Sequence, residues 1–232
     1  MTRASTELGT PFSLRKDLSA RGTDFVVSDL HPEAREQLGD LDWLIPAVQP
    51  RGDEFAFTYP PGTPSVDAAF ENLSRSAASM WRQHAEVDRA DWQGAFRRFL
   101  SLADGTDIDW ALIGGVSLAI RGVTAAAATP DVDIITTPDG ARQLTDLLRD
   151  WVTSPAVDLP DFGWFGRAFV GAKIEWLGND SHDNAWRFDD PWEEYEWEGR
   201  TLLVPSLEVY LRIERGRGRI DRVQGIEAVL GA

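Results

Sequence analysis

The chain of 232 residues contains no cysteine, only three histidines and only two lysines, Lys16 and Lys173. Without cysteine there is no disulfide, no thiolate nucleophile and no metal site built on sulfur. The histidines (His31, His84 and His182) are too far apart for an H-x-x-x-H metal motif. The N-terminus lacks the apolar segment of a secretory signal, and no apolar run approaches the roughly 20 residues of a membrane span. We therefore expect a cytoplasmic protein without a membrane partner.

Basic residues are also scarce, because 23 lysines and arginines face 38 acidic residues and give a net charge of −15. A chain of that charge repels nucleic acids and anionic membranes, which argues against long nucleic acid as a partner. With 43% hydrophobic and 26% charged residues, the composition is typical of a globular protein. The length suits one domain, or a core domain with an appendage.

The pattern of apolar residues changes near residue 105. Residues 1–24 are polar without a clear period and are predicted to form a loose leader. Short strands are predicted at Asp24–Leu30 and at Glu54–Tyr59, where large and small side chains alternate. Two helices with one apolar face each are predicted next, the first with Ser65 as its N-cap. Residues 1–105 are thus expected to be a mixed N-terminal segment of unassigned role.

From Trp110 onward, predicted strands and helices alternate. Strands are predicted at 110–113, 131–136, 169–177 and 201–204, and helices at 116–121, from Thr137, at 206–214 and at 219–230. Thr137 as N-cap and Pro138 as first residue favour a helix start at that point. We predict an α/β (α+β) fold, in which residues 106–232 form a small mixed sheet flanked by helices with a helical C-terminal tail.

Asp131-x-Asp133 is the candidate site. The motif alone is weak, since the same spacing occurs in Asp40/Asp42 and Asp107/Asp109. Only the pair at 131 and 133 begins an apolar strand that follows a strand, two glycines and a short helix. Residues i and i+2 of a strand point to the same face, so these two carboxylates can meet.

Two adjacent carboxylates repel each other unless a cation neutralises them. Hard oxygen ligands without histidine or cysteine favour Mg²⁺ or Mn²⁺. Two such ions about 3.5–4 Å apart can activate an attacking oxygen and stabilise a leaving pyrophosphate. Glu175, on a neighbouring predicted strand, is the candidate third acid, although Lys173 lies on the same strand face and simple pairing between them is the alternative.

The segments LIGGVSLAIRG and TPDVDIIT together resemble the nucleotidyltransferase superfamily, which has the polymerase-beta-like fold. In that family a Gly-Gly or Gly-Ser turn after a strand precedes a short helix and an Asp-x-Asp strand. The closing segment VPSLEVYLRIERGRGRIDRVQGI is similar to the branch that includes abortive-infection toxins and lincosamide-type nucleotidyltransferases. The resemblance covers roughly Trp110–Leu230 and does not extend to residues 1–105.

The resemblance implies transfer of a nucleoside monophosphate from an NTP to an acceptor hydroxyl. It implies Mg²⁺ (or Mn²⁺) held by Asp131, Asp133 and Glu175, with Glu175 also able to act as a base. Nucleotide binding is implied for Gly114 and Gly115 through the close approach that glycine permits, for Ser117 through a phosphate hydrogen bond, and for Arg121, Arg212 and Arg219. Here Arg121 stands in for an arginine that the family usually has just before Asp-x-Asp, and Arg212 for a lysine in the closing helix.

The only basic cluster consists of Arg212, Arg215, Arg217, Arg219 and Arg222. It suits a triphosphate or an RNA backbone through bidentate guanidinium contacts. Pairing within the helix is the alternative, because Glu208 and Arg212 are four residues apart.

An acidic and aromatic segment, Asn179–Glu198, bears on the acceptor. It holds eight acidic residues together with Trp186, Trp192, Tyr195 and Trp197. Carboxylates and ring faces suit a small cationic acceptor such as an aminoglycoside, whereas a solvated hairpin whose tryptophans cap the core is the structural alternative. A tRNA end or a protein side chain are the other acceptors, and the family branch also implies an antitoxin-type partner protein.

Two alternative functions stay open. One is a catalytically degenerate nucleotidyltransferase fold that binds a nucleotide or a protein. The other is a serine hydrolase, because Gly115-Val-Ser117-Leu-Ala119 is close to the G-x-S-x-G motif of a nucleophilic serine. In that case Asp133 or Asp158 and His182 would be the partners, but Ala119 stands where the last glycine is needed.

Overall fold

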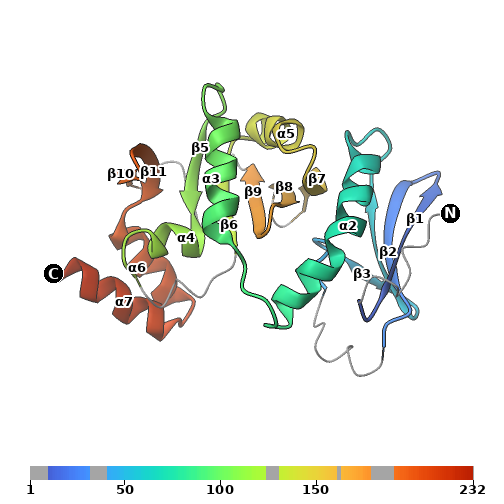
Figure 1. Ribbon diagram of the computed structural model, residues 1–232, viewed down its shortest axis with the longest axis horizontal. Coiled ribbons are helices and arrows are strands. Elements are labelled where there is room, and N and C mark those ends of the chain that lie inside the picture. The colour runs from blue at the N-terminus through green and yellow to red at the C-terminus, as the bar shows by residue number, and fades with distance from the viewer. Residues whose placement is uncertain (1–9, 32–40, 124–130, 161–162, 179–190, 232) are drawn as a thin grey trace.

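The computed structural model describes residues 10–31, 41–123, 131–160, 163–178 and 191–231. Its elements form three groups along the longest axis: an N-terminal sheet with a long helix, a central sheet with helices, and a C-terminal hairpin with two helices (Figure 1). The mixed α/β fold class predicted from the sequence is confirmed.

The N-terminal group is an antiparallel sheet of order β1-β2-β4-β3. Its elements are β1 (Ser13–Ser19), β2 (Gly22–Ser28), β3 (Gln49–Arg51), β4 (Glu54–Tyr59) and the helix α2 (Val66–His84). The prediction of a loose leader is wrong for residues 13–24, which form β1 and the start of β2. The polar side chains of β1 are satisfied within the sheet, since Arg15 Nη1 lies 2.5 Å from Glu54 Oε1 while Leu14 is buried.

The start of α2 differs in detail from the prediction. Ser65 does precede the helix, but its backbone is left-handed (φ 60°) and its hydroxyl makes no capping hydrogen bond. A residue in that conformation cannot aim its side chain at the first free N–H groups as an ordinary N-cap does.

The central group is a five-stranded sheet of order β5-β6-β9-β8-β7. Its elements are α3 (Trp92–Ala103), β5 (Trp110–Ile113), α4 (Gly114–Ala119), β6 (Val132–Thr136), α5 (Pro138–Leu147), β7 (Val152–Leu159), β8 (Gly163–Phe169) and β9 (Lys173–Gly178). β6 and β9 are parallel, and the other pairs are antiparallel. The single strand predicted at 169–177 is wrong, because β8 ends at Phe169 and a turn through Gly171 (φ 81°) leads into β9.

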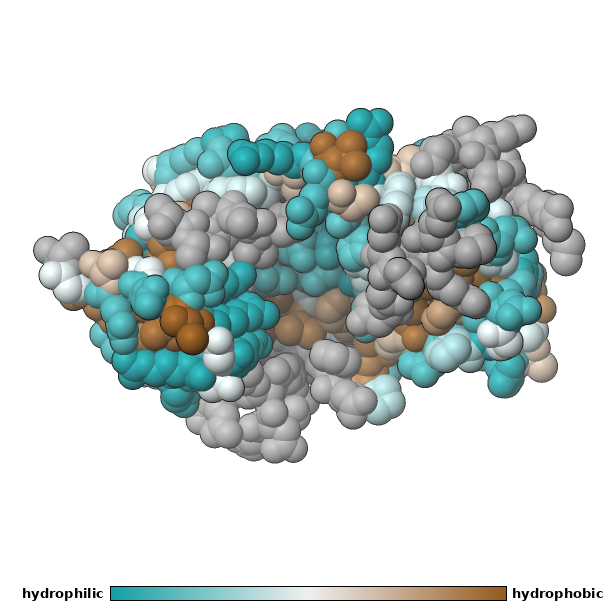
Figure 2. Space-filling model, turned by 90° about the horizontal axis from the view of Figure 1, so that it is seen from below, coloured by the Kyte–Doolittle hydropathy of each residue, from teal (hydrophilic) through white to brown (hydrophobic). Residues whose placement is uncertain are grey.

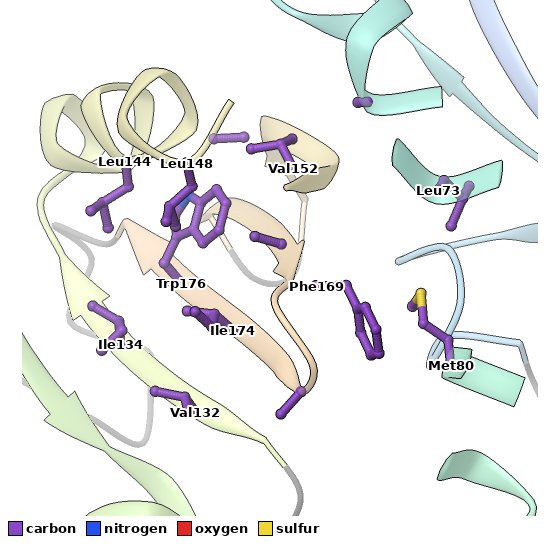
Figure 3. Close-up of a cluster of buried hydrophobic side chains, with 14 of the residues drawn as sticks. Leu73, Met80, Val132, Ile134, Leu144, Leu148, Val152, Phe169, Ile174 and Trp176 are labelled. Atoms are coloured by element: carbon purple, nitrogen blue, oxygen red, sulfur yellow. The ribbon is translucent and has the colours of Figure 1, made fainter. Parts of the chain in front are cut away.

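One face of the central sheet packs against α5 (Figure 3). Trp176 of β9 is fully buried beside Leu144 and Leu148, and its Nε1 donates to the Ala141 carbonyl at 3.1 Å. The predicted start of α5 is confirmed, since the Thr137 hydroxyl accepts a hydrogen bond from the backbone N–H of residue 140 at 3.0 Å. The sheet is thereby anchored to a well-capped helix.

The opposite face packs against the C-terminal group, which consists of β10 (Trp192–Trp197), β11 (Arg200–Pro205), α6 (Leu207–Gly216) and α7 (Ile220–Leu230). Ile113 and Ile135 of the sheet join one cluster with Tyr210 of α6 and Ile226 of α7. Because side chains alternate along a strand, the odd-numbered residues of β6 and β9 lie on this face.

The main hydrophobic core continues across residue 105. One cluster contains Phe25 and Leu73 from the N-terminal group as well as Ile174 from the central sheet. The Tyr59 hydroxyl also lies 2.7 Å from Ser154 Oγ of β7. Across the residues that the structure describes, no helix combines the length and apolar character needed to cross a membrane.

Candidate active site

Asp131, Asp133 and Glu175 lie on the sheet face that packs against the C-terminal helices. Asp131 immediately precedes β6, Asp133 is its second residue, and the parallel pairing of β6 and β9 sets Asp133 beside Glu175. These strand starts and the end of β5 lie at the lower edge of the sheet in Figure 1. Figure 2 views the molecule from that side, and its recessed middle carries both hydrophilic and hydrophobic residues.

Gly114 closes one side of this group. β5 pairs with β6 so that Ile113 lies opposite Asp133, and the chain then turns at Gly114 with a φ of 70°. A Cβ atom on Gly114 would lie 1.8 Å from Asp133 Oδ2, so only glycine allows the carboxylate and the backbone to approach this closely. The sequence analysis gave Gly114 a role in nucleotide binding. The structure shows in addition that its backbone lies close to the Asp133 carboxylate.

Replacing Gly114 by alanine should therefore cost stability and displace the Asp133 carboxylate. We expect the free energy of unfolding to fall by about 1–3 kcal/mol, the cost of a non-glycine residue in a sparsely populated backbone conformation. Urea denaturation measures the change. Gly216→Ala is the matched control, because a Cβ atom there meets nothing within 4 Å, and it should leave stability unchanged or slightly higher. Equal losses for both variants would contradict this role of Gly114.

Glu175 is held by two cationic side chains. Arg167 of β8 pairs with it across the sheet, with Nε and Nη2 at 2.7 and 2.6 Å from Oε1, and only 4% of the Arg167 side chain is exposed. Lys173 Nζ lies 3.9 Å from the same oxygen. Burial acts to raise the pKa of Glu175, but the charges of Arg167 and Lys173 outweigh it and hold that pKa below its usual value.

Asp131 and Asp133 are less well compensated. Lys173 Nζ lies 3.0 Å from Asp131 Oδ2, while Asp131 Oδ1 is buried without a hydrogen-bond partner. Burial raises the pKa of Asp131, and Lys173 only partly offsets it. Burial, followed by the negative charges of Glu175 and Asp131, raises the pKa of Asp133 well above its ordinary value. The positive charge near these two carboxylates thus compensates them only in part.

These features decide which residues fit a divalent cation. The unpartnered Oδ1 of Asp131 and the poorly compensated Asp133 carboxylate are oxygen donors of the kind that Mg²⁺ and Mn²⁺ prefer. Glu175 is engaged by Arg167. Within the described ranges, no group of three Asp, Glu or His side chains is arranged to hold a metal ion. The Asp131 and Asp133 carboxylates therefore fit a divalent cation, and the role of Glu175 as a third ligand stays a prediction, because here its carboxylate pairs with Arg167.

Ser117 and Arg121 lie inside the protein beside Tyr210. Ser117 is fully buried, and its Oγ accepts a long hydrogen bond from Arg121 Nη2 at 3.5 Å. Arg121 stacks over the Tyr210 ring at 5.2 Å, reaches Glu193 at 3.4 Å, and exposes 4% of its side chain. Neither group is open to a phosphate in this arrangement. A nucleophilic serine must be reachable by its substrate, so burial of Ser117 also opposes the serine-hydrolase alternative, whose His182 lies outside the described residues.

Most of the C-terminal arginines lie around one buried carboxylate, that of Glu214. Glu214, 1% exposed, has guanidinium groups of Arg217, Arg219 and Arg222 within 3.5–3.8 Å. Arg219, a candidate for the nucleotide, is thus partly engaged, and Arg212 is exposed on α6. The sequence analysis placed Arg222 in the basic cluster without singling it out, whereas in the structure its charge acts on the Asp133 carboxyl and opposes the rise of its pKa. Its place, next to an aspartate in the closing helix, gave no signal of this proximity.

The described part of the acidic segment forms the β10–β11 hairpin. Tyr195 and Trp197 pack against the main core, and the Tyr195 hydroxyl donates to the Ile120 carbonyl at 2.8 Å. Glu198 pairs with Arg97 at 2.7 Å. The structural alternative, in which aromatic side chains cap the core, holds for these residues, while 179–190 lie outside the described ranges.

Comparisons with known proteins complete this description. No family model and no curated protein matches the chain. Among solved structures, the chain is similar to TM1012 from Thermotoga maritima, provisionally assigned as a nucleotidyltransferase (TM-score 0.47, 20% identity, 61% of this chain and 93% of that chain). It is also similar to ANT(2")-Ia in complex with adenylyl-2"-tobramycin (TM-score 0.43, 14% identity, 59% and 87%) and to the solution structure of this antibiotic-resistance factor (0.42, 12%, 60% and 82%). Each of these likenesses covers about three fifths of this chain, at 12–20% identity.

Proposed function

We propose that the protein transfers a nucleoside monophosphate from an NTP to an acceptor hydroxyl. The proposal is carried by one arrangement: Asp131 and Asp133 converge under a turn where Gly114 alone fits, and an oxygen of Asp131 is buried without a partner. Partly buried carboxylates whose negative charge is only partly compensated are suited to hold a cation together with an anionic substrate. Neighbouring Arg222 adds a positive charge on the side of α7.

In the proposed reaction the acceptor oxygen forms a bond to the α-phosphorus and loses its proton to solvent, and pyrophosphate leaves as the bond from that phosphorus to the bridging oxygen breaks. Mg²⁺ or Mn²⁺ on Asp131 and Asp133 would supply Lewis-acid stabilisation of the phosphate charge. Glu175 is ionised at neutral pH, because Arg167 and Lys173 lower its pKa despite burial. It can therefore accept a hydrogen bond from the acceptor hydroxyl and orient it.

The acceptor that fits the overall charge is small and cationic. A net charge of −15 attracts cations and repels polyanions, so a polycationic aminoglycoside ranks ahead of a tRNA end. A protein hydroxyl and an antitoxin-type protein remain further candidates for an acceptor and a partner.

The salt bridge between Arg167 and Glu175 supports a second candidate function. A carboxylate that is bound to a buried guanidinium is a weak base and a poor metal ligand. A chain with this pairing could bind a nucleotide or a protein without transferring a nucleotide, as a degenerate member of the fold would.

The decisive experiment separates these two candidates. We expect an NTP with Mg²⁺ to raise the melting temperature, and label from an α-³²P-labelled NTP to appear on an aminoglycoside but not on tRNA. Asp131→Asn should reduce label transfer by at least about 100-fold, the effect of losing a preorganised charge contact in an active site. Binding without transfer to any acceptor would support the binding module instead.

Asp107→Asn is the matched control for Asp131→Asn. Asp107 belongs to another Asp-x-Asp pair, is exposed, and precedes the start of β5, which pairs with the end of β6 farther from Asp131. Transfer by this variant should equal that of the parent protein. If Asp131→Asn also transfers label at the parent rate, the proposed function is wrong.

A further inference from the structure

Lys173 occupies a position between two of the three site carboxylates. Its Nζ lies 3.0 Å from Asp131 Oδ2 and 3.9 Å from Glu175 Oε1, and 18% of its side chain is exposed. It is one of only two lysines in the chain. In an otherwise arginine-based set of cations, this site thus holds a compact ammonium group, which resembles a small metal ion more closely than a planar guanidinium does.

The N-terminal group fixes the position of Lys173. The end of α2 contacts the turn before β9, where Gln83 Nε2 donates to the Gly171 carbonyl at 2.7 Å. Lys173 lines a small cavity of about 40 Å³ together with Trp43, Met80, Gln83 and His84. The rings of Trp43 and His84 stack at 4.4 Å on that side. The N-terminal group thus borders Lys173 on one side, and Asp131 pairs with its ammonium group on the other.

The charges around the site leave little place for two divalent ions. Lys173 and Arg167 face the carboxylates of Asp131, Asp133 and Glu175, which leaves one uncompensated negative charge. One divalent ion would balance that charge and add a single positive charge for the substrate to neutralise. A second ion would have to enter a partly buried site that already carries excess positive charge, with Arg222 nearby.

The carboxylate oxygens that are available as ligands also indicate a single divalent ion. Asp131 uses Oδ2 for Lys173 and keeps Oδ1 without a partner, so one of its two oxygens is available to a cation. Glu175 directs Oε1 to both Arg167 and Lys173. A second ion bridging Asp131 and Glu175 would need the place that the ammonium group occupies.

We propose that the site binds one divalent ion, on Asp131 and Asp133, and that Lys173 takes the place of a second ion between Asp131 and Glu175. This inference rests on the proposed function, and it assigns the N-terminal group a role in positioning the internal cation. Lys173 is a positioning residue in this scheme, since it neutralises and orients the Asp131 carboxylate that would hold the ion.

The test is the number of Mn²⁺ ions bound per chain, measured by isothermal titration calorimetry and by electron paramagnetic resonance of free Mn²⁺, without NTP. We expect one ion for the parent protein and two for Lys173→Met, because removal of the ammonium group frees Asp131 Oδ2 and takes away a positive charge beside Glu175. Lys173→Arg should still bind one. Lys16→Met is the matched control, since Lys16 pairs with the exposed Asp67 at 2.6 Å, and it should also bind one.

Each other outcome overturns the inference. Two ions in the parent, or an unchanged single ion in Lys173→Met, would show that Lys173 does not substitute for an ion. A single ion bound more tightly by Lys173→Met would mean that lysine and metal compete for one position. Two ions in the parent would leave the proposed function intact, whereas absence of Mn²⁺ binding would overturn both. Lys173→Gln, with the same expectation as Lys173→Met, replaces it if circular dichroism shows that the methionine variant is unfolded.

Discussion

Replacement of Asp133 by asparagine is expected to abolish nucleotide transfer and, at the same time, to stabilise the metal-free protein. Transfer should fall by at least about 100-fold, because a charged contact at the reacting phosphate is lost. Stability should rise because burial, together with the negative charges of Glu175 and Asp131, raises the pKa of the Asp133 carboxyl well above its ordinary value. The amide has the same shape without that charge. Label transfer and thermal unfolding in EDTA measure the two effects.

The pH dependence gives this prediction its sign. A raised pKa in the folded state means that the protonated form is the stable one. The contribution of Asp133 to stability is therefore complete below the ordinary aspartate pKa of 3.8 and is lost as the pH rises through the raised folded value. The advantage of Asp133→Asn over the parent should thus be small near pH 4 and should grow toward pH 8. Added Mg²⁺ should raise the melting temperature of the parent only. A stability difference between the two proteins that does not change with pH would contradict the attribution of the instability to the ionised Asp133 carboxylate.

Replacement of Arg167 by methionine is expected to produce the largest loss of stability. The side chain is 4% exposed and is the main counter-charge of Glu175. Removal of one partner of a buried ion pair leaves the other charge uncompensated, at a cost of about 3–5 kcal/mol in the free energy of unfolding. Urea denaturation at pH 7.5 measures this change.

Two further variants separate the charge effect from lost packing. Arg97→Met removes a similar pair with Glu198, but there the two side chains are 50% and 45% exposed, so the loss should stay below about 1 kcal/mol. The double variant Arg167→Met/Glu175→Gln should recover most of the stability lost by the single change, because no unpaired charge is left. A double variant as unstable as the single one would mean that the loss comes from packing.

The sequence predicted the elements around the site better than the rest of the sheet. β5, β6 and α5 have clear apolar patterns and a well-defined cap at Thr137, and the structure has them where predicted. β7 escaped prediction. It is buried along nearly its whole length and so lacks alternation, it contains Pro155, and its register with β8 shifts on either side of Ser154.

The candidate site shows the same limit at the level of side chains. Spacing along one strand was enough to bring Asp131 and Asp133 together, because the period of a strand is local. Glu175 could be placed beside them only by guessing which strands are neighbours. Arg167, the main partner of Glu175, lies on β8. The sequence analysis predicted only the last residue of that strand, Phe169. An arginine flanked by Gly166 and Ala168 in an apolar stretch was the available signal, since arginine is seldom buried unless paired.

The contact between Gln83 and the turn before β9 ties folding of the N-terminal sheet to events at the site. If the ordered position of Lys173 depends on α2, then any ligand that favours this arrangement also favours the docked N-terminal sheet, by thermodynamic reciprocity. Occupation of the site would then slow hydrogen exchange in β2, although β2 provides none of the site carboxylates. The stability of the N-terminal sheet would in this way depend on whether a ligand occupies a site whose carboxylates all come from the rest of the chain.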